Sequence, residues 1–276
     1  MGQKGFFTDT TLCIGCKACE VACKQWNRLP ADGYQMTGHS YDNTTALSST
    51  TWRHVAFVEQ KRSVDGKTSL ADRPGTAGYE GGIGDLNGKT VNWLMMSDVC
   101  KHCTHAGCME ACPTGAIIRN EFGDVYVQPD ICNGCGYCVP SCPFGVIGRN
   151  EETGNAAKCT LCYDRQKYGI EPACAKACPT DSIVFGDLDE LKEKAKQRVT
   201  TLRERNVPTA YLYGVDEDTS VGDLNAFFLL TERPSVYNLP ERPHLPQNNV
   251  LPGFVASAIT ATFLTLATAI SLWRGR

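Results

Sequence analysis

The chain has 276 residues, of which 42% are hydrophobic and 21% charged, a composition typical of an ordered globular protein and not of a disordered one. Its formal net charge is −3 and no block rich in lysine or arginine stands out, so the sequence gives no reason to expect a nucleic-acid partner. Sixteen cysteines could serve as disulfides, zinc ligands or iron ligands, and their spacing distinguishes these uses.

The N-terminus lacks a charged segment leading into a long apolar run, so we expect no secretion signal. The first cysteine group, CIGCKACEVAC, extends from Cys13 to Cys23. A long insertion, residues 24–99, follows it. Two stretches of this insertion, WRHVAFVEQ and VNWLMM, are rich in β-forming residues and are predicted to be strands. Its glycine-rich GYEGGIGDLNG lacks the full GxGxxG spacing of a nucleotide site and is predicted to be a loop.

Three further cysteine groups follow closely on one another. They are CKHCTHAGCMEAC from Cys100, CNGCGYCVPSC from Cys132 and CTLCYDRQKYGIEPACAKAC from Cys159, with a strand predicted at GDVYVQ before the second of them. Each ends in Cys-Pro and a similar phrase: Thr-Gly-Ala-Ile, Phe-Gly-Val-Ile or Thr-Asp-Ser-Ile. Such self-similarity indicates one supersecondary unit used repeatedly. The first group departs from it, because Lys24 follows Cys23.

The spacing of the cysteines points to iron–sulfur clusters. Cysteines two residues apart in a tight loop reach three corners of a 4Fe–4S cubane together, and in two-cluster ferredoxins the fourth cysteine of each run binds the other cluster. A four-cysteine zinc site needs only two CxxC pairs, whereas the first and third groups crowd four cysteines into a short run, which favours iron. No CxxC pair is followed by histidine, so covalent haem attachment is excluded.

We predict four 4Fe–4S clusters bound by crossed ligation, in which the first group pairs with the fourth and the second with the third. Each group then lends its last cysteine to its partner's cluster. The four ligand sets are Cys13, Cys16, Cys19 with Cys178 (site A); Cys159, Cys162, Cys174 with Cys23 (site B); Cys100, Cys103, Cys108 with Cys142 (site C); and Cys132, Cys135, Cys138 with Cys112 (site D).

Several basic residues accompany the cysteines. A cation there would favour the more negative, reduced form of a cluster, although solvated lysines are the alternative interpretation. We single out Lys158, next to Cys159, as a cofactor-binding residue. The other lysines beside the groups are Lys17, Lys24, Lys101 and Lys176. The histidines have no evident partners and are interpreted as polar surface or hydrogen-bonding structure: His39, His54, His102, His105 and His244.

The C-terminal part of the chain contains no cysteine. The segment LDELKEKAKQRVTTLRERN has the periodicity and mixed charge of an exposed amphipathic helix, and the proline-rich RPSVYNLPERPHLPQNN is predicted to be an extended linker. Residues 252–273 contain no charged residue and no histidine. As a helix they would span roughly 33 Å, close to the hydrocarbon core of a bilayer. We predict a single transmembrane helix, with a buried core helix as the alternative.

The order and spacing of the four groups resemble the iron–sulfur subunits that serve molybdopterin or tungstopterin oxidoreductases, over most of residues 8–185. Within that superfamily CIGCKACEVACKQWN, GHSYDN, CGYCVPSCPFG, KCTLCYDR and EPACAKACPT are similar to the β subunits of membrane-bound formate dehydrogenases. Related nitrate reductase subunits have a tryptophan at one cysteine position of the third group and build a 3Fe–4S cluster there. All four positions are cysteine here, which argues for four full cubanes.

The resemblance implies an electron-transfer subunit with no bond chemistry of its own. Electrons from a pterin-bound metal in a catalytic α subunit would cross the four clusters to a membrane cytochrome b and then reduce quinone. Sites A and B would face the catalytic subunit, and site D would lie nearest the membrane haem. Two alternatives stay open: a thiosulfate, polysulfide or sulfoxide reductase as the catalytic partner, or a structural metal-binding module that only bridges proteins.

The expected fold is α+β, with two pseudo-symmetric ferredoxin-like dicluster domains, inserted segments and one C-terminal transmembrane helix. Residues 1–98 with 150–190 would form the first domain, and residues 99–149 the second. An amphipathic helix and extended linker, residues 191–249, would lead to the membrane helix at residues 250–273.

The orientation of that helix follows from its flanking charges. Arg274 and Arg276 end the chain, so the positive-inside bias places the C-terminus in the cytoplasm and the cluster domain on the periplasmic or outer face of the cell membrane. In the family it resembles, the twin-arginine signal of the catalytic partner carries the folded subunit across. A stripe of small residues, predicted to admit another helix, recurs at every fourth position: Gly253, Ser257, Ala261, Thr265 and Ala269.

Overall fold

A four-stranded sheet with the order β8-β1-β10-β9 forms the centre of the protein, a computed structural model in which residues 2–33, 42, 44–63, 89–216 and 218–275 are described. Its strands are β1 (Lys4–Asp9), β8 (Ile183–Asp187), β9 (Tyr211–Tyr213) and β10 (Ala226–Leu230). β1 pairs in parallel with β10, and the outer pairs are antiparallel. Strand β1 thus brings the first cysteine group beside the last.

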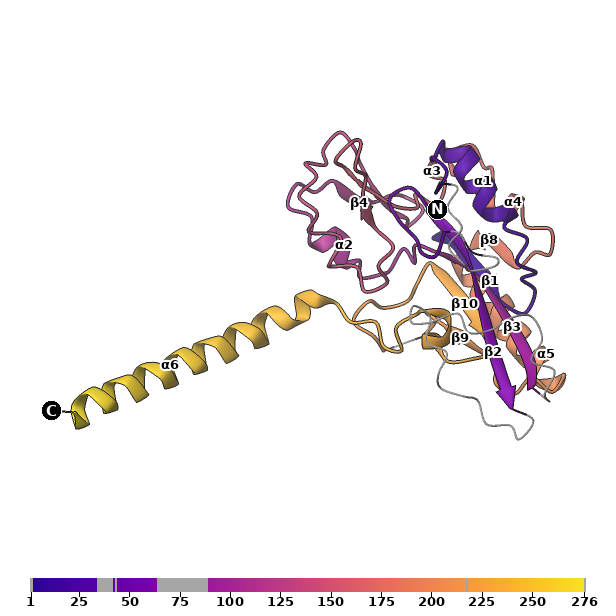
Figure 1. Cartoon of the computed structure of the whole chain (residues 1–276). Coiled ribbons are helices and arrows are strands. Elements are labelled where there is room, and N and C mark those ends of the chain that lie inside the picture. The colour runs from indigo at the N-terminus through magenta and orange to yellow at the C-terminus, as the bar shows by residue number, and fades with distance from the viewer. Residues whose placement is uncertain (1, 34–41, 43, 64–88, 217, 276) are drawn as a thin grey trace.

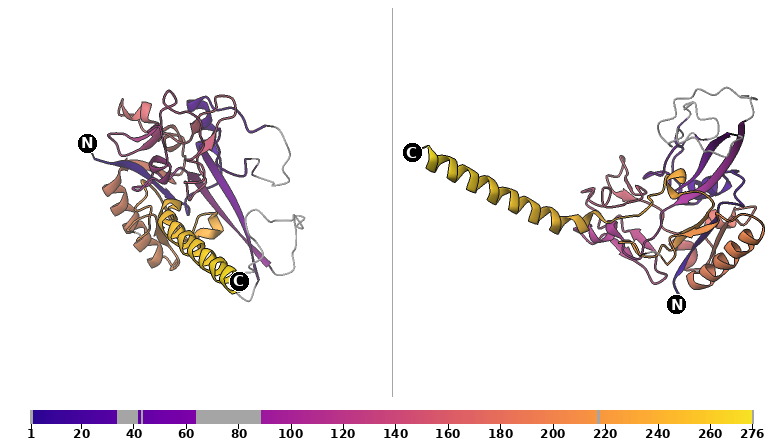
Figure 2. Two further views of the ribbon diagram at one scale, coloured as in Figure 1. Left: turned by 90° about the vertical axis from the view of Figure 1, so that its left-hand side faces the viewer. Right: turned by 90° about the horizontal axis from the view of Figure 1, so that it is seen from below.

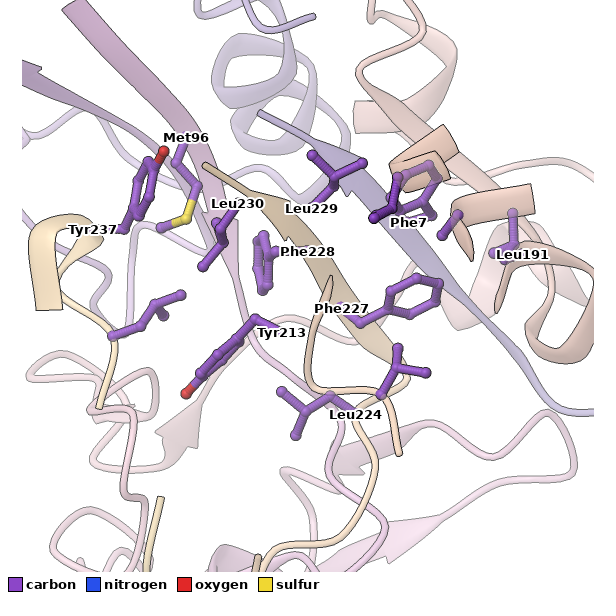
Figure 3. Packing of buried hydrophobic residues seen from close by; sticks show 14 of the residues in the cluster. Phe7, Met96, Leu191, Tyr213, Leu224, Phe227, Phe228, Leu229, Leu230 and Tyr237 are labelled. Carbon is purple, nitrogen blue, oxygen red and sulfur yellow. The ribbon is translucent and has the colours of Figure 1, made fainter. Parts of the chain in front are cut away.

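The two faces of this sheet pack against different partners. Phe7 of β1 packs with Phe227 of β10 and with Leu191 of helix α5 (Leu188–Glu204), in the core drawn in Figure 3. The neighbouring Phe6 faces the other way, into a core that contains the thiols of Cys19 and several other cysteines. Strand β10 is buried along its whole length, as a strand covered on both faces must be. One face therefore supplies stability and the other supports the cysteine groups.

The predicted strands at WRHVAFVEQ and VNWLMM form a long antiparallel hairpin, β2 (Arg53–Ser63) and β3 (Lys89–Val99), in which Arg53 pairs with Val99. Two short ribbons join the later groups. They are β4 (Ile117–Arg119) with β5 (Val125–Val127), which confirms the strand at GDVYVQ, and β6 (Gly148–Arg149) with β7 (Ala156–Ala157). The glycine-rich stretch at residues 78–88, most of GHSYDN and His39 lie outside the described residues.

Short helices carry several of the cysteines. Helices α1 (Ala18–Asn27), α3 (Tyr163–Gln166) and α4 (Ala173–Lys176) lie together at one end of the body, while α2 (Gly107–Glu110) and β4 lie on the side from which the C-terminal helix departs (Figure 1). The first and fourth cysteine groups are thus neighbours in space, although the insertion and two other groups separate them in sequence.

The prediction of an amphipathic helix and an extended linker for residues 191–249 is correct for the helix and wrong for the linker. The predicted helix is present as α5 and buries one stripe of leucine, alanine and valine, but the residues beyond it add β9 and β10 to the central sheet. The proline-rich stretch contains two single-turn helices, η1 (Pro234–Tyr237) and η2 (Pro246–Asn249). It is held against the body because Tyr237, Leu239 and Leu245, spaced between the prolines, insert into the core.

Helix α6 (Val250–Arg274) projects away from the body without contact along most of its length (Figures 1 and 2). The segment Pro246–Arg274, which contains α6, is the one helical segment among the described residues that is long and apolar enough to cross a membrane. None of its most apolar stretch is buried. A helix is therefore present where the transmembrane helix was predicted, and it is not the buried core helix of the alternative. Its exposed apolar surface suggests a membrane anchor.

Candidate iron–sulfur centres

The four CxxC loops share one backbone geometry. In each group the residue just before the second cysteine has a positive φ: 66° at Gly15, 46° at His102, 71° at Gly134 and 54° at Leu161. Glycine adopts this conformation freely, but His102 and Leu161 adopt it at a cost of about 1–2 kcal/mol. Both are buried, so packing compensates for the strain. The repeated turn shows that the four groups use the same local structure.

The exits from the later groups repeat as well. The third residue after the last cysteine has a positive φ in each Cys-Pro group, at Gly115, Gly145 and Asp181. After Cys23 the polypeptide instead continues as helix α1 to Asn27. This difference agrees with the absence of proline there, because proline cannot continue a helix without losing a hydrogen bond.

The thiols of site A meet around one small cavity. Its lining includes Cys13, Cys16, Cys19 and Cys178, together with Ser97. Cys13 and Cys16 come from the loop after β1, Cys19 from α1, and Cys178 from the turn that follows α4. Burial raises the pKa of Cys13, and the nearby charges of Cys178 and Cys16 raise it further.

Site B forms a second cavity, lined in part by residues of α1 and α4. Its lining includes Cys23, Cys159, Cys162 and Cys174. All four side chains are buried. Burial raises the pKa of Cys23 to about 12, and the charge of Cys174 contributes in the same direction. A buried thiol of this kind becomes a thiolate only when a metal binds it.

Site C brings together thiols from the second and third groups. Burial raises the pKa of Cys103 well above its usual range, and the charges of Cys100, Cys142 and Cys108 add to this effect. Three of the four ligands come from one loop and the start of α2, and Cys142 arrives from the neighbouring group. The spatial neighbours are thus the members of the predicted set.

Site D, like site A, is more exposed than sites B and C. Burial raises the pKa of Cys138 to about 11, with further contributions from Cys112, Cys132 and Cys135. The backbone N–H of Ala156 lies 3.4 Å from Cys132 Sγ and donates to it. Cys135 is exposed, and Cys112 and Cys132 are only partly buried.

The donor chemistry of the four sets fits 4Fe–4S clusters. All sixteen cysteines are free thiols, so none is committed to a disulfide. Among the described residues no group of three or more histidine, cysteine or acidic side chains is arranged to hold a single metal ion. The sulfurs of a zinc site all lie about 2.3 Å from one centre, whereas cubane ligands surround four irons and lie further apart. Four thiols that are not arranged around one metal ion suit a 4Fe–4S cluster, which is larger than a zinc ion.

Consecutive sites adjoin one another in the order A, B, C and D. At each step, a thiol of one site lies close to a thiol of the next. Burial is the main cause of the raised pKa of one member of the pair, and the charge of the other member raises it further. The pairs at the three steps are Cys19 with Cys174, Cys159 with Cys100, and Cys108 with Cys138. Such a succession is the arrangement required for electron transfer in short steps.

Lys158 lies between sites B and C. Its side chain is buried, and Nζ donates to Cys100 Sγ at 3.4 Å, to the carbonyl of Cys159 at 3.1 Å and to the carbonyl of Val125. Burial lowers the pKa of Lys158, but the charges of Cys100, Cys108 and Cys159 outweigh it and the net shift is upward. The lysine therefore remains a cation between two sets of thiols.

The other lysines beside the cysteine groups contact carboxylates. Lys17 pairs with Glu20 and Asp42, and the remaining ion pairs are Lys24 with Asp32, Lys101 with Asp98, and Lys176 with Glu171. Three of the histidines expected to lack partners have them. The exposed His244 lies 3.0 Å from Asn249 Oδ1 through its Nε2, and the other two are buried. His54 bonds Asp42 at 2.8 Å, and His102 accepts the N–H of Val125. Both histidines are buried hydrogen-bonding structure.

One charged residue was not singled out by the sequence. Arg53 begins strand β2 and is almost fully buried, and its Nη2 lies 3.3 Å from Cys174 Sγ. The sequence shows only an arginine at the start of a stretch of β-forming residues. The alternation of polar and apolar residues does not tell whether such an arginine is buried or exposed.

Comparisons with known proteins agree with this chemistry. A family model described as "4Fe-4S dicluster domain" matches residues 91–188. The chain is 37% identical over 241 residues to the formate dehydrogenase iron–sulfur subunit of Haemophilus influenzae, covering 86% of this chain and 68% of that protein. It is 36% identical over 267 residues to the nitrate-inducible formate dehydrogenase iron–sulfur subunit of Escherichia coli, covering 94% and 81%. A subunit of the anaerobic dimethyl sulfoxide reductase of Escherichia coli is 32% identical over 197 residues, covering 70% and 77%.

Proposed function

We infer that this chain, which belongs to the family of formate dehydrogenase iron–sulfur subunits, carries electrons through four 4Fe–4S clusters from a formate-oxidising catalytic subunit to a membrane cytochrome b. The catalytic subunit would hold molybdenum or tungsten on a pterin, and the cytochrome would reduce quinone. The observation that carries the proposal is the succession of four adjoining cysteine sets. A bound 4Fe–4S cluster supplies one-electron chemistry at each set.

The residues of this chain hold, separate and insulate the electron carriers. Crossed ligation ties the first group to the fourth and the second to the third, and it underlies the proposed division into two dicluster domains. The core beneath Phe6 covers Cys19 of site A and helps to exclude water from site B, whose four cysteines are all buried. Lys158 would stabilise the negative charge that sites B and C gain on reduction, since its ammonium group touches ligands or their backbone on both sides.

The placement of the chain in the complex is supported by the base of helix α6. Gln247, at that base, donates to the carbonyl of Gly107 in the second cysteine group at 2.8 Å. A Cβ on Gly107 would lie 2.9 Å from the side chain of Leu245, so the fit there is close. Sites C and D therefore lie on the side from which the membrane anchor departs. This supports a path in which site A receives electrons from the catalytic subunit and site D passes them to the cytochrome.

The proposed orientation places the cluster domain on the periplasmic or outer face and the C-terminus in the cytoplasm. It is supported by Arg274 and Arg276 at the end of the apolar helix, with no basic residue on the other side nearer than Arg242. Cysteine-reactive labelling of a variant with one added cysteine at the C-terminus, in intact and opened cells, measures the side directly. Labelling in intact cells would contradict the orientation.

The function is tested on the complex purified from detergent extracts. Formate should bleach the visible absorbance of the clusters, and a quinone analogue should restore it. The relative among dimethyl sulfoxide reductase subunits favours a second candidate, in which a sulfoxide reoxidises chemically reduced clusters and formate has no effect. A complex that contains zinc and no iron would instead support a structural metal-binding module.

A further inference from the structure

The buried guanidinium of Arg53 lies at the step between sites A and B. Its side chain is 1% exposed and is among the largest fully buried side chains of the described residues. Strand β2 starts at this residue, and its pairing with Val99 at the end of β3 directs the side chain toward the cysteine core. A buried arginine is unusual unless it is paired, so its partners define its role.

The guanidinium contacts both sites through its two terminal nitrogens. Nη2 donates to Cys174 Sγ of site B at 3.3 Å. Nη1 donates to the carbonyl of Ser97 at 3.2 Å and to its hydroxyl at 3.3 Å. The same hydroxyl shares a hydrogen bond of 3.2 Å with Cys19 Sγ of site A. One planar group therefore reaches a ligand of site B directly and a ligand of site A through one serine.

The positive charge of Arg53 has no carboxylate partner within the part of the chain that the structure describes. The ring of Phe6, 4.8 Å from the guanidinium carbon, provides only a weak cation–π contact. A buried, unpaired cation costs several kcal/mol. The nearby negative charges are the cysteine thiolates of sites A and B, and they supply the compensation.

Arg53 has a further buried donor in its Nε–H group. This group has no acceptor among the described residues, although the atom is fully buried. Buried donors normally find an acceptor, and one that has none in the protein is expected to serve a bound group. The sulfide and thiolate sulfurs of a cluster are acceptors of this type.

We propose that Arg53 is a shared cation that stabilises the reduced clusters of sites A and B together. This rests on the proposed function as an iron–sulfur electron carrier. A cluster gains one negative charge on reduction, so a fixed positive charge beside it raises its reduction potential. Arginine suits this position better than lysine, because its planar fork directs separate N–H groups at two acceptors. Removing the charge lowers both potentials and leaves sites C and D unchanged.

The test is a redox titration of the intact membrane complex, followed by electron paramagnetic resonance. Cluster signals are assigned to sites with single Cys→Ser variants. In Arg53→Gln, the ratio of reduced to oxidised cluster at a fixed potential should fall about tenfold at sites A and B, which is about 59 mV for a one-electron couple. Arg53→Lys retains the charge and should restore most of this shift.

The matched control is Lys176→Gln, which removes an exposed cation from α4 close to the same ligands. It should move no potential. Unchanged potentials in Arg53→Gln, or an equal shift at all four sites, would overturn the proposal. If Arg53→Gln assembles without clusters, Arg53→Lys decides: four clusters near wild-type potentials support the role of charge, and shifted or missing clusters refute it. A wild-type complex without iron refutes the proposed function instead.

Discussion

Replacing Lys158 by methionine removes one buried charge and retains most of the side-chain volume. The lysine lies between sites B and C, where its Nζ is 3.4 Å from Cys100 Sγ. The two polar contacts to the carbonyls of Val125 and Cys159 are lost as well. Because each cluster gains negative charge on reduction, we expect the reduction potentials of sites B and C to fall.

The size of the fall follows from the distance between the charges. The added electron spreads over a cluster that lies beyond the ligand sulfur, so the effective separation from Nζ exceeds the hydrogen-bond distance and is roughly 8 Å. At an effective dielectric constant of about 20, unit charges at that separation interact by about 2 kcal/mol. For a one-electron couple this energy corresponds to about 90 mV, since a tenfold change is about 1.4 kcal/mol and about 59 mV.

The measurement is a redox titration of the purified complex, with Lys24→Met as the control because Lys24 pairs with Asp32 and donates to the backbone of Thr50. Iron content must stay equal to wild type, so that potentials are compared between fully loaded proteins. A shift at sites A and D of the same size as at B and C would refute the placement of Lys158. Unchanged potentials at B and C would refute its electrostatic role.

Three further predictions test the ligands, the loops and the anchor. Cys178→Ser should remove the resonance of site A and leave that of site B, whereas uncrossed ligation predicts loss at site B. Gly134→Ala should reduce cluster content and lower the midpoint temperature at which the cluster absorbance bleaches, because the added Cβ would lie 2.4 Å from the carbonyl oxygen of Gly154. The control is Gly136→Ala, whose Cβ would meet no atom of the described residues within 4 Å. It should cost only the backbone strain of about 1–2 kcal/mol. Replacing Ala261 and Thr265 by leucine should leave the chain in the membrane but loosen the cytochrome in detergent, and equal recovery of the complex would show that the stripe faces lipid.

The ligand sets could be predicted from the sequence because the rule behind them is local. Three corners of a cubane are reached from one short loop, and the repeated Cys-Pro exit sends the fourth cysteine away from it. The positive φ at Gly15 and Gly134 is also visible as a glycine before the second cysteine. At His102 and Leu161 the same turn is hidden, because burial stabilises a conformation that their side chains disfavour.

The order of strands in the central sheet could not be predicted from the sequence in the same way. Strand β10 lies between β1 and β9, although β1 and β10 are separated by almost the whole chain. Parallel pairing over such a distance leaves no turn signal in the sequence. The proline-rich segment from Pro234 to Asn249 resembles a linker in composition, yet three of its side chains enter the core. Composition alone does not separate an extended linker from an extended segment that packs.

The two buried cations differ in how far each lies from its site in sequence. Lys158 adjoins Cys159, so a search along the cysteine groups finds it. Arg53 precedes its contact Cys174 by 121 positions and reaches it only through the register of the hairpin. Electrostatic partners of a cluster are therefore found from sequence only when they share its loop.

Burial and positive charge coincide at site B. Site B has four buried thiols and lies between Arg53 and Lys158, whereas site D is partly exposed and has water available to solvate added charge. Adding an electron to a buried anionic cluster is unfavourable without a nearby cation, because desolvation disfavours the more charged form. Site B should therefore respond to loss of either cation, site A to Arg53 alone, and site C to Lys158 alone. A potential at site B that responds to neither substitution would show that backbone N–H donors, such as that of Leu161 to Cys159 Sγ, supply its stabilisation instead.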